Sequence, residues 1–243
     1  VELRLHIFNP SGLDQSDKRP AIVFFFGGGW VSGSPGQFFP HCQYLASRGM
    51  VAISAEYRVK NRHGTTPLEC VADGKSAVRW VRTHAGELGV DPDRIAAGGG
   101  SAGGHVAASA GIVQGLDEEH EDASVSSVPN ALVLFNPVVD LSVVADRFGE
   151  RGLAISPVRH VREDLPPTII FHGTADQLVP IESVERFCEK MTEAGNRCEL
   201  VKFEGRPHAF FNYGTSKEDY ADTVRRADRF LTSLGYLEGD ATI

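Results

Sequence analysis

The stretch RIAAGGGSAGGH, residues 94–105, constrains the fold more than any other part of this chain. It contains the pattern G-x-S-x-G over residues 99–103, with Ser101 at its centre. The small apolar residues before it suit a buried strand, and the run AGGHVAASAGIV after it suits a helix. A serine at such a strand-to-helix turn sits on a sharp, strained elbow that pushes its hydroxyl out of the backbone. We therefore expect a strand, an elbow and a helix here, with Ser101 as the leading candidate for a nucleophile.

The same letters fit two other patterns. Gly98, Gly100 and Gly103 spell G-x-G-x-x-G, the phosphate-binding turn of NAD(P)-dependent oxidoreductases and other dinucleotide-binding folds. That turn belongs to the first strand–helix unit, with an acidic residue about 20 positions later. Here at least three strand-like segments come first, and the acidic residues 117–119 fall in a polar loop. A glycine-rich turn that merely lets a helix pack close to a sheet is the third interpretation. The motif alone does not decide among them.

Strand-like and helix-like segments alternate along the whole chain. Apolar runs typical of strands occupy residues 3–8, 21–26, 50–57, 131–140, 167–173 and 197–203, besides the segment before Ser101. Helical patterns occupy residues 37–49, 67–88, 181–195 and 217–235. This alternation predicts an α/β fold with a mostly parallel central sheet of about eight strands, flanked by helices on both faces. No repeat or linker divides the chain, so we expect residues 1–243 to form a single domain. Its ligand site should lie at the carboxyl ends of the strands.

Composition excludes several classes of function. The 243 residues are 42 % hydrophobic and 23 % charged, and their net charge is −8. No apolar run is long enough to span a membrane, and the acidic balance argues against nucleic acid as a partner. We expect a soluble protein, either cytoplasmic or secreted with its signal peptide removed, because the chain begins with Val1 and no signal peptide is visible. The four cysteines lack zinc-ligand spacing. Cys188 and Cys198 are expected to be buried free thiols, with a disulfide between them as the alternative.

A serine hydroxyl needs a base within hydrogen-bonding distance to act as a nucleophile. Histidine is the natural base because its ordinary pKa lies near neutral pH. His208 follows the final predicted strand in the loop EGRPHAFFN, which is punctuated by glycine and proline, and it is the best placed. His172 ends a strand and is expected to position a loop or to pack. His105 is close to Ser101 in sequence but falls inside the following helix, so we expect it to point away.

A carboxylate must then fix the imidazole tautomer and stabilise the imidazolium. Asp176 lies in the loop HGTADQLVP after a predicted strand, where it can point inwards. Asp140, which follows FNPVV, is the alternative. The chain order Ser101, Asp176, His208 is the order that an α/β-hydrolase uses.

The last requirement is an oxyanion hole, in which backbone N–H groups stabilise the negative charge of a tetrahedral intermediate. The glycines 27–29 follow a buried strand and can bend so that two amides face inwards, and the Ala102 N–H completes the set. Several aromatic residues close to these loops are candidates to line the substrate pocket: Trp30, Tyr57, Phe210 and Phe211.

With these loops the chain resembles the α/β-hydrolase esterases, especially the hormone-sensitive-lipase-like branch and the bacterial carbohydrate (acetylxylan or feruloyl) esterases. The resemblance covers nearly the whole length and rests on FFFGGGW, SAEYR, GGSAGG, HGTADQLVP and EGRPHAFFN. It implies a nucleophile at Ser101, an acid at Asp176, a base at His208, and oxyanion donors at Gly28, Gly29 and Ala102. It also implies hydrolysis of carboxylic esters through an acyl-enzyme, with no cofactor and no metal. A binding module that has lost catalysis is the alternative from another class.

The chain departs from the family pattern at two places. The family usually has HGGG where this chain has Phe26 followed by three glycines, which puts the rigidity of the glycine loop in question. We expect no N-terminal cap of the kind that many relatives carry, because the strand-like segments start almost at residue 2, and we expect covering structure only in the irregular stretch 140–165. A small site with little lid favours short acyl groups, and the segments ISPVRHV and DQLVP resemble the branch that removes acyl groups, such as acetyl, from carbohydrate.

Overall fold

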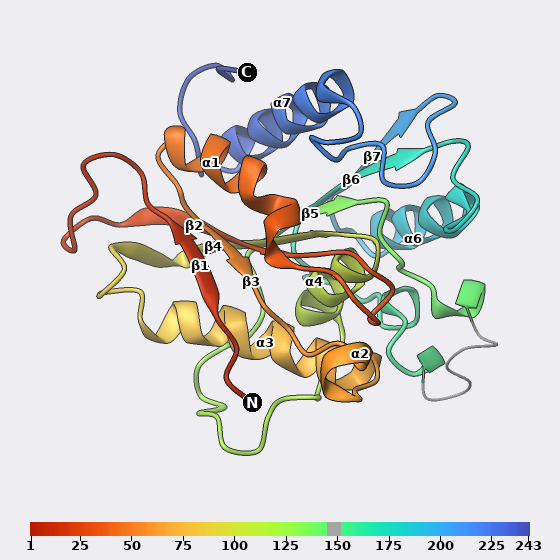
Figure 1. The fold of residues 1–243 in the computed structure, drawn as a ribbon, viewed down its shortest axis with the longest axis horizontal. Coiled ribbons are helices and arrows are strands. Elements are labelled where there is room, and N and C mark those ends of the chain that lie inside the picture. The colour runs from red at the N-terminus through yellow and green to blue at the C-terminus, as the bar shows by residue number, and fades with distance from the viewer. Residues whose placement is uncertain (145–151) are drawn as a thin grey trace.

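The computed structural model describes residues 1–144 and 152–243, and its core is one sheet (Figure 1). Within these residues the sheet has seven strands in the order β1-β3-β2-β4-β5-β6-β7, compared with the expected number of about eight. Only β1 is antiparallel to its neighbour, and the other pairings are parallel. The strands are β1 (Leu5–Phe8), β2 (Arg19–Phe25), β3 (Val51–Ala55), β4 (Val90–Gly100), β5 (Ala131–Phe135), β6 (Thr168–Gly173) and β7 (Cys198–Phe203).

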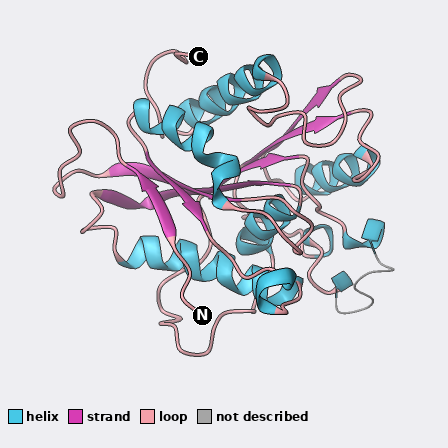
Figure 2. Cartoon of the chain, in the orientation of Figure 1, coloured by secondary structure: helices cyan, strands magenta, loops and turns pink. Residues whose placement is uncertain are grey.

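Helices cover both faces of the sheet, as the alternating pattern predicts (Figure 2). They are α1 (Phe39–Ser47), α2 (Lys60–His63), α3 (Pro67–Thr83), α4 (Ala102–Ile112), α6 (Ile181–Glu193) and α7 (Lys217–Ser233). Side chains alternate along β2, so Val23 and Phe25 belong to the core that also contains residues of α3, α4 and α6. Ile22 and Phe24 belong to the core that contains residues of α1 and α7. The two apolar cores account for the continuous hydrophobic runs of the central strands, which are buried on both faces.

The strand order reverses between β2 and β4, and this places the site. The chain moves outwards from β2 to β3 and then crosses back to β4. In open α/β sheets ligands bind at the carboxyl ends of the strands next to such a reversal. The glycine loop leaves β2 there, and Ser101 follows directly after β4.

Ser101 occupies a sharp elbow between β4 and α4, and its φ of 53° lies in the left-handed region that costs a non-glycine residue free energy. Two glycines make this geometry possible. A Cβ at Gly103 would lie 2.0 Å from the carbonyl oxygen of Phe25, and one at Gly99 would lie 2.4 Å from that of Gly103. Gly98 lies inside β4 opposite Phe24, whose ring fills the space that a side chain would take. The glycines therefore serve close packing at the elbow, which argues against the dinucleotide-binding interpretation.

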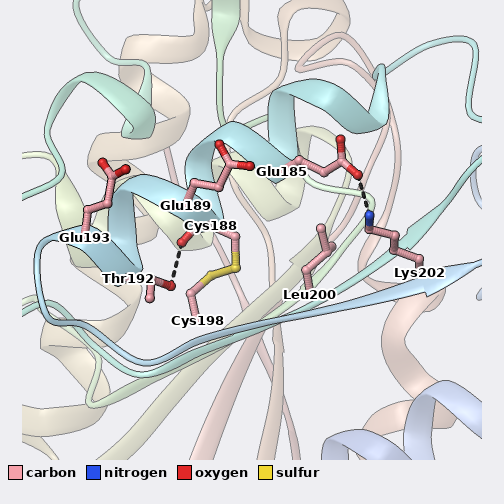
Figure 3. A pocket seen from close by; sticks show the side chains of 8 residues that line it. All are labelled: Glu185, Cys188, Glu189, Thr192, Glu193, Cys198, Leu200 and Lys202. Carbon is pink, nitrogen blue, oxygen red and sulfur yellow. Dashed lines mark hydrogen bonds and ion pairs between the residues drawn. A yellow bond between two sulfur atoms is a disulfide. The ribbon is translucent and has the colours of Figure 1, made fainter.

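The expectation of two free thiols is wrong, because Cys188 of α6 and Cys198 of β7 form a disulfide (Figure 3). Their Cα atoms are 5.5 Å apart, within the range that disulfide geometry requires. The apolar face of α6 packs against the sheet next to β7, the edge strand, so two cysteines ten positions apart face each other. Cys42 and Cys70 are the buried free cysteines.

The irregular stretch 140–165 contains two short 3₁₀ helices, Leu141–Val144 and Pro157–Arg159. Residues 145–151 of this expected covering segment lie outside the described residues. No large cap domain covers the sheet in the part of the chain that the structure describes (Figure 1). None of the described helices is both long and apolar enough to cross a membrane.

Candidate active site

A cavity of about 390 Å³ opens at the carboxyl ends of the strands, between the glycine loop and the loop after β7. Ser101 and His208 lie on its wall together with the glycines 27–29. The walls are mixed in character, because Gln37 and Asn136 are polar whereas Val138, Val144, Leu178 and Val179 are apolar. The cavity thus holds a potential nucleophile and base next to apolar surface.

Ser101, His208 and Asp176 form a continuous hydrogen-bonded row. The Nε2 atom of His208 lies 3.0 Å from the Oγ atom of Ser101, and its Nδ1 atom lies 2.6 Å from Oδ2 of Asp176. The carboxylate can only accept from the ring, so Nδ1 carries the hydrogen. With the hydrogen on Nδ1, the lone pair of Nε2 can accept the serine proton. This is the arrangement that activates a serine hydroxyl.

The loop around Asp176 fixes the direction of its carboxylate. Oδ1 accepts hydrogen bonds from the backbone N–H groups of Leu178 and Val179, both at 2.9 Å. Burial opposes ionisation of Asp176, but the hydrogen bonds from His208 and from these N–H groups outweigh it and hold its pKa below the ordinary value of 3.8. Asp176 is therefore ionised at neutral pH.

His208 is held through the backbone of the next residue. Ala209 has a φ of 64°, a strained conformation for a residue with a side chain. Its N–H donates to Oδ1 of the fully buried Asn136 at 3.0 Å, and its carbonyl accepts from Nδ2 of Asn212 at 3.0 Å. Asn136 Nδ2 also lies 3.4 Å from Nε2 of His208. Two asparagines thus stabilise the strained residue that orients the imidazole.

The other candidates for acid and base lie elsewhere. Asp140 pairs with Arg186, and its carboxylate also accepts from the N–H of Ser142. His172 contacts the carbonyl of Val179 at 2.9 Å, so it supports the loop that carries Asp176. Asp140 therefore does not take part in the hydrogen-bonded row. His172 lies outside the row and supports the loop that carries Asp176.

His105 points away from the elbow into the core below the site. Its Nδ1 accepts from the indole N–H of Trp30 at 3.2 Å, so Nε2 carries the hydrogen and donates to the carbonyl of Ile155 at 3.0 Å. Burial lowers the pKa of His105 to about 4, and the ring is neutral at ordinary pH. His105 therefore supports Trp30 in the cavity wall.

The glycine loop is held without the usual histidine. The ring of Phe26 stacks on Tyr57 at 4.3 Å, and the Tyr57 hydroxyl donates to the Phe26 carbonyl at 2.7 Å. After it, the Gly28 carbonyl accepts from the N–H groups of Val31 and Ser32, both at 3.1 Å. Stacking and these hydrogen bonds fix both ends of the loop, so Phe26 does not leave it unsupported.

Two of the residues expected to supply oxyanion donors, Gly28 and Gly29, line the cavity together with Ser101, and the third, Ala102, directly follows Ser101. Gly28 has a φ of 132° and Gly29 one of 62°, and a Cβ at Gly28 would lie 2.2 Å from the carbonyl oxygen of Ser32. The loop therefore requires glycine at Gly28. The N–H of Gly27 is taken by Gln37, at 2.6 Å from its Oε1. Ala102 is the first residue of α4, where a helix N–H has no partner four residues earlier.

The wall of the cavity contains only some of the aromatic residues predicted to line it. Trp30 and Phe211 line the cavity. Tyr57 and Phe210 do not, and both are wrong as pocket residues: Tyr57 is fully buried behind the glycine loop, and Phe210 packs on Phe203. The lining residues that were not predicted are polar or aliphatic: Gln37, Asn136, Val138, Val144, Leu178, Val179 and Ala209. The position of Asn136 directly after β5 could have indicated that it lies at the site.

Among the described residues, no three His, Cys, Asp or Glu side chains are arranged to hold a metal ion. The cavity brings together a hydroxyl, an imidazole hydrogen-bonded to it, an ionised carboxylate behind the imidazole and a glycine loop. Such a site can transfer an acyl group to the serine.

Comparison with solved structures shows the same fold in an esterase. Esterase 2 of Thermogutta terrifontis, solved after phosphoramylation by tabun, has a TM-score of 0.95 and 53 % identity, covering 99 % of this chain and 92 % of that chain. The propionate-bound structure of the same esterase has a TM-score of 0.95 and 52 % identity, with the same coverage of both chains. The described part of the chain thus has the α/β-hydrolase fold.

Sequence comparison points the same way. The probable carboxylic ester hydrolase LipM of Mycobacterium tuberculosis is 28 % identical over 258 residues, covering 95 % of this chain and 58 % of its own length. The chain spans about half the length of the curated relatives it matches. The BD-FAE family profile matches residues 5–152 and 148–191, which is more than half of the sequence. The chain therefore belongs to the BD-FAE family, as its esterase-like motifs predicted.

Proposed function

We propose that this protein is a serine carboxylesterase that hydrolyses short-chain acyl esters. The observation that carries the proposal is the hydrogen-bonded row from Ser101 through His208 to Asp176, with distances of 3.0 and 2.6 Å. Its relatives and structural neighbours include carboxylic ester hydrolases and esterases, which supports the same class of reaction. In this proposal residues 1–243 act as one α/β-hydrolase domain.

The reaction begins when His208 takes the proton of Ser101 through Nε2. The Ser101 oxygen attacks the ester carbonyl, and Asp176 stabilises the imidazolium that forms. The tetrahedral intermediate collapses as the alcohol leaves with the proton from His208, and the acyl group stays on Ser101. Water then attacks the acyl-enzyme with His208 again as base, and the carboxylic acid and the free serine are released.

In the intermediate the former carbonyl oxygen carries a negative charge. We assign its stabilisation to the N–H groups of Gly28, Gly29 and Ala102. A donor of this kind contributes about 2.7–4 kcal/mol to transition-state stabilisation. The Gly27 N–H donates to Gln37 and is not among the donors assigned.

The substrate is a small ester with a short acyl group. The apolar walls from Leu178 and Val144 enclose a cavity of about 390 Å³, near the small end for ligand sites. The esterase with which this chain shares 52 % identity was solved with propionate bound. Acetyl groups on carbohydrate fit such a cavity, since the sugar can stay outside while the acyl group enters.

The substrate proposal is tested with p-nitrophenyl acetate, butyrate and octanoate together with acetylated xylan. We expect rapid turnover of acetate and butyrate, and a kcat/KM for octanoate at least about tenfold lower because the acyl chain outgrows the cavity. Release of acetate from xylan supports a carbohydrate substrate. Equal rates on all three small esters contradict the short-chain preference.

The disulfide between Cys188 and Cys198 supports action in an oxidising compartment, since such bonds persist there. Thiol titration of the denatured protein, isolated without reductant and without thiol-blocking reagents, tests this proposal. Two reactive thiols agree with it, and four thiols contradict it.

A further inference from the structure

A chain of side-chain amides joins the two loops of the site. It runs from the Gly27 N–H through Gln37 and Asn212 to the Ala209 carbonyl, and we call it the amide strap. Gln37 Oε1 accepts from Gly27 N–H at 2.6 Å, and Gln37 Nε2 donates to Asn212 Oδ1 at 2.9 Å. Asn212 Nδ2 then donates to the Ala209 carbonyl at 3.0 Å. The strap thus reaches from the glycine loop to the residue after His208.

The backbone groups at both ends fix the orientation of both amides. The Gly27 N–H can only donate, so the Gln37 oxygen must face it and the Gln37 NH₂ must face Asn212. The Ala209 carbonyl can only accept, so the Asn212 NH₂ must face Ala209. Every group in the row therefore has a complementary partner, and no amide can flip without losing hydrogen bonds at both ends.

Gln37 is itself held in place. It lies in the 3₁₀ helix Pro35–Phe38, whose Pro35 carbonyl accepts from the Ser54 hydroxyl at 2.8 Å. Phe38, the next residue, is fully buried and stacks on Phe24 of β2. The backbone of Gln37 is thus anchored on the sheet, and its side chain lines the cavity. Because its backbone is anchored, the Gln37 side chain can hold the glycine loop at a fixed distance from the sheet.

We propose that Gln37 is a positioning residue for ester hydrolysis. It acts through the strap and keeps the glycine loop at a fixed position relative to His208. This inference rests on the proposed function. By accepting from the Gly27 N–H, Gln37 fixes the peptide plane that precedes those of Gly28 and Gly29. Through Asn212 it also restrains the strained Ala209. Relative displacement of the two loops would move the oxyanion donors away from the carbonyl that Ser101 attacks.

The test is a double-mutant cycle with Gln37→Met and Asn212→Leu, two variants that remove the amides and keep side chains of similar size. The readouts are kcat and KM for p-nitrophenyl butyrate, the pH profile of kcat/KM, and Tm. We expect each variant to lower kcat about 10- to 100-fold with KM changed less than about threefold, as for small misplacements of catalytic groups. The double variant should be no worse than about twofold below the poorer single variant, since both break one strap.

Gln37→Glu separates the two ends of the strap. Its carboxylate still accepts from the Gly27 N–H but cannot donate to Asn212, so we expect a kcat between those of the wild type and Gln37→Met. Gln43→Met, at an exposed position of α1, is the matched control and should retain wild-type kcat.

The outcomes distinguish the strap from the proposed function. A wild-type protein that does not hydrolyse p-nitrophenyl butyrate overturns both. If the wild type is active, a wild-type kcat in Gln37→Met overturns the strap alone. So does a double variant whose fold loss of kcat equals the product of the two single-variant losses. A change confined to KM would make Gln37 a substrate contact and also overturns it. If Gln37→Met fails to fold, Asn212→Leu decides: wild-type kcat overturns the strap, and a kcat about 10- to 100-fold lower with KM changed less than about threefold supports it.

Discussion

The Nε2 atom of His208 lies 3.0 Å from the hydroxyl oxygen of Ser101, although 107 positions separate the two residues in the chain. Ser101 follows β4, in the middle of the sheet, whereas His208 lies in the loop after β7 at its edge. The loop after β7 must therefore reach back over the carboxyl ends of β5 and β6. Asn136, directly after β5, holds it there through the N–H of Ala209. The contact between Asn136 and Ala209 therefore helps to hold His208 within hydrogen-bonding distance of Ser101.

Asp176→Asn should abolish most of the activity while the fold remains. The amide offers an N–H to His208 where the carboxylate offered only acceptors, which favours the wrong imidazole tautomer. We expect kcat for p-nitrophenyl butyrate to fall about 10⁴-fold. Asp140→Asn is the matched control, since Asp140 pairs with Arg186 outside the site, and it should retain kcat within about twofold. A greater loss in Asp140→Asn than in Asp176→Asn would contradict the assignment of the acid.

Tyr57→Phe tests how the glycine loop is supported. The variant leaves the buried Phe26 carbonyl without the hydroxyl that donates to it at 2.7 Å. We expect the free energy of unfolding to fall by about 1–3 kcal/mol, the cost of an unsatisfied buried group, and kcat to fall with it. Urea denaturation and steady-state kinetics measure the two effects. Tyr213→Phe, at an exposed position, is the control. Unchanged stability in Tyr57→Phe would show that stacking alone holds the loop.

Stability should fall as the solution is acidified, because His41 is buried among aromatic rings. Neither ring nitrogen has a hydrogen-bond partner among the described residues, and burial lowers the pKa of His41 from 6.5 to about 3. Unfolded His41 takes up a proton below pH 6.5, whereas folded His41 stays neutral down to about pH 3. The unfolded state therefore binds more protons in this window, and stability is lost as pH falls through it.

The measurement compares urea denaturation at pH 7.5 and 4.5 for the wild type and His41→Leu. A group with this pKa shift contributes about 2–3 kcal/mol of destabilisation between the two pH values. We expect the variant to lose less stability than the wild type by about this amount. His120→Leu, at an exposed position, controls for loss of an imidazole elsewhere. Equal losses in the wild type and His41→Leu would contradict the shifted pKa.

The disulfide should stabilise the fold without taking part in catalysis. It closes a short loop, since the two cysteines are ten positions apart, and the chain-entropy estimate is about 3 kcal/mol. We expect reductant to lower Tm of the wild type, whereas a variant with both Cys188→Ser and Cys198→Ser should have the low Tm with or without reductant. The kcat at 25 °C should stay within about twofold. A wild-type Tm that does not respond to reductant would contradict a stabilising role.

The sequence allowed prediction of the features that depend on local pattern. The apolar runs predicted the strands, and the positions of Asp176, His208 and the glycines directly after strands predicted loops at one edge of the sheet. The elbow was predictable because G-x-S-x-G couples a strand to a helix. These inferences need only the rule that the carboxyl ends of parallel strands share one edge.

Contacts between distant loops could not be predicted in the same way. Gln37 and Asn212 have no distinctive local pattern, and their roles arise only when two loops 175 positions apart meet. Tyr57 was expected in the pocket because it lies near a strand end, but its ring faces the back of the glycine loop. The disulfide depended on the orientation of α6 on the sheet, which periodicity does not fix. Each of these features needs the tertiary packing.

The role of Ser101 as nucleophile is tested most directly by covalent labelling with an organophosphonate. Wild type and Ser101→Ala are treated with the reagent, their intact masses are measured, and labelled peptides are mapped. Hydrolysis of p-nitrophenyl butyrate is followed in parallel. The account predicts one adduct per wild-type chain on Ser101, none in Ser101→Ala, and a kcat about 10⁴-fold or more lower in a folded variant. An adduct on another residue, or wild-type turnover by Ser101→Ala, would contradict it.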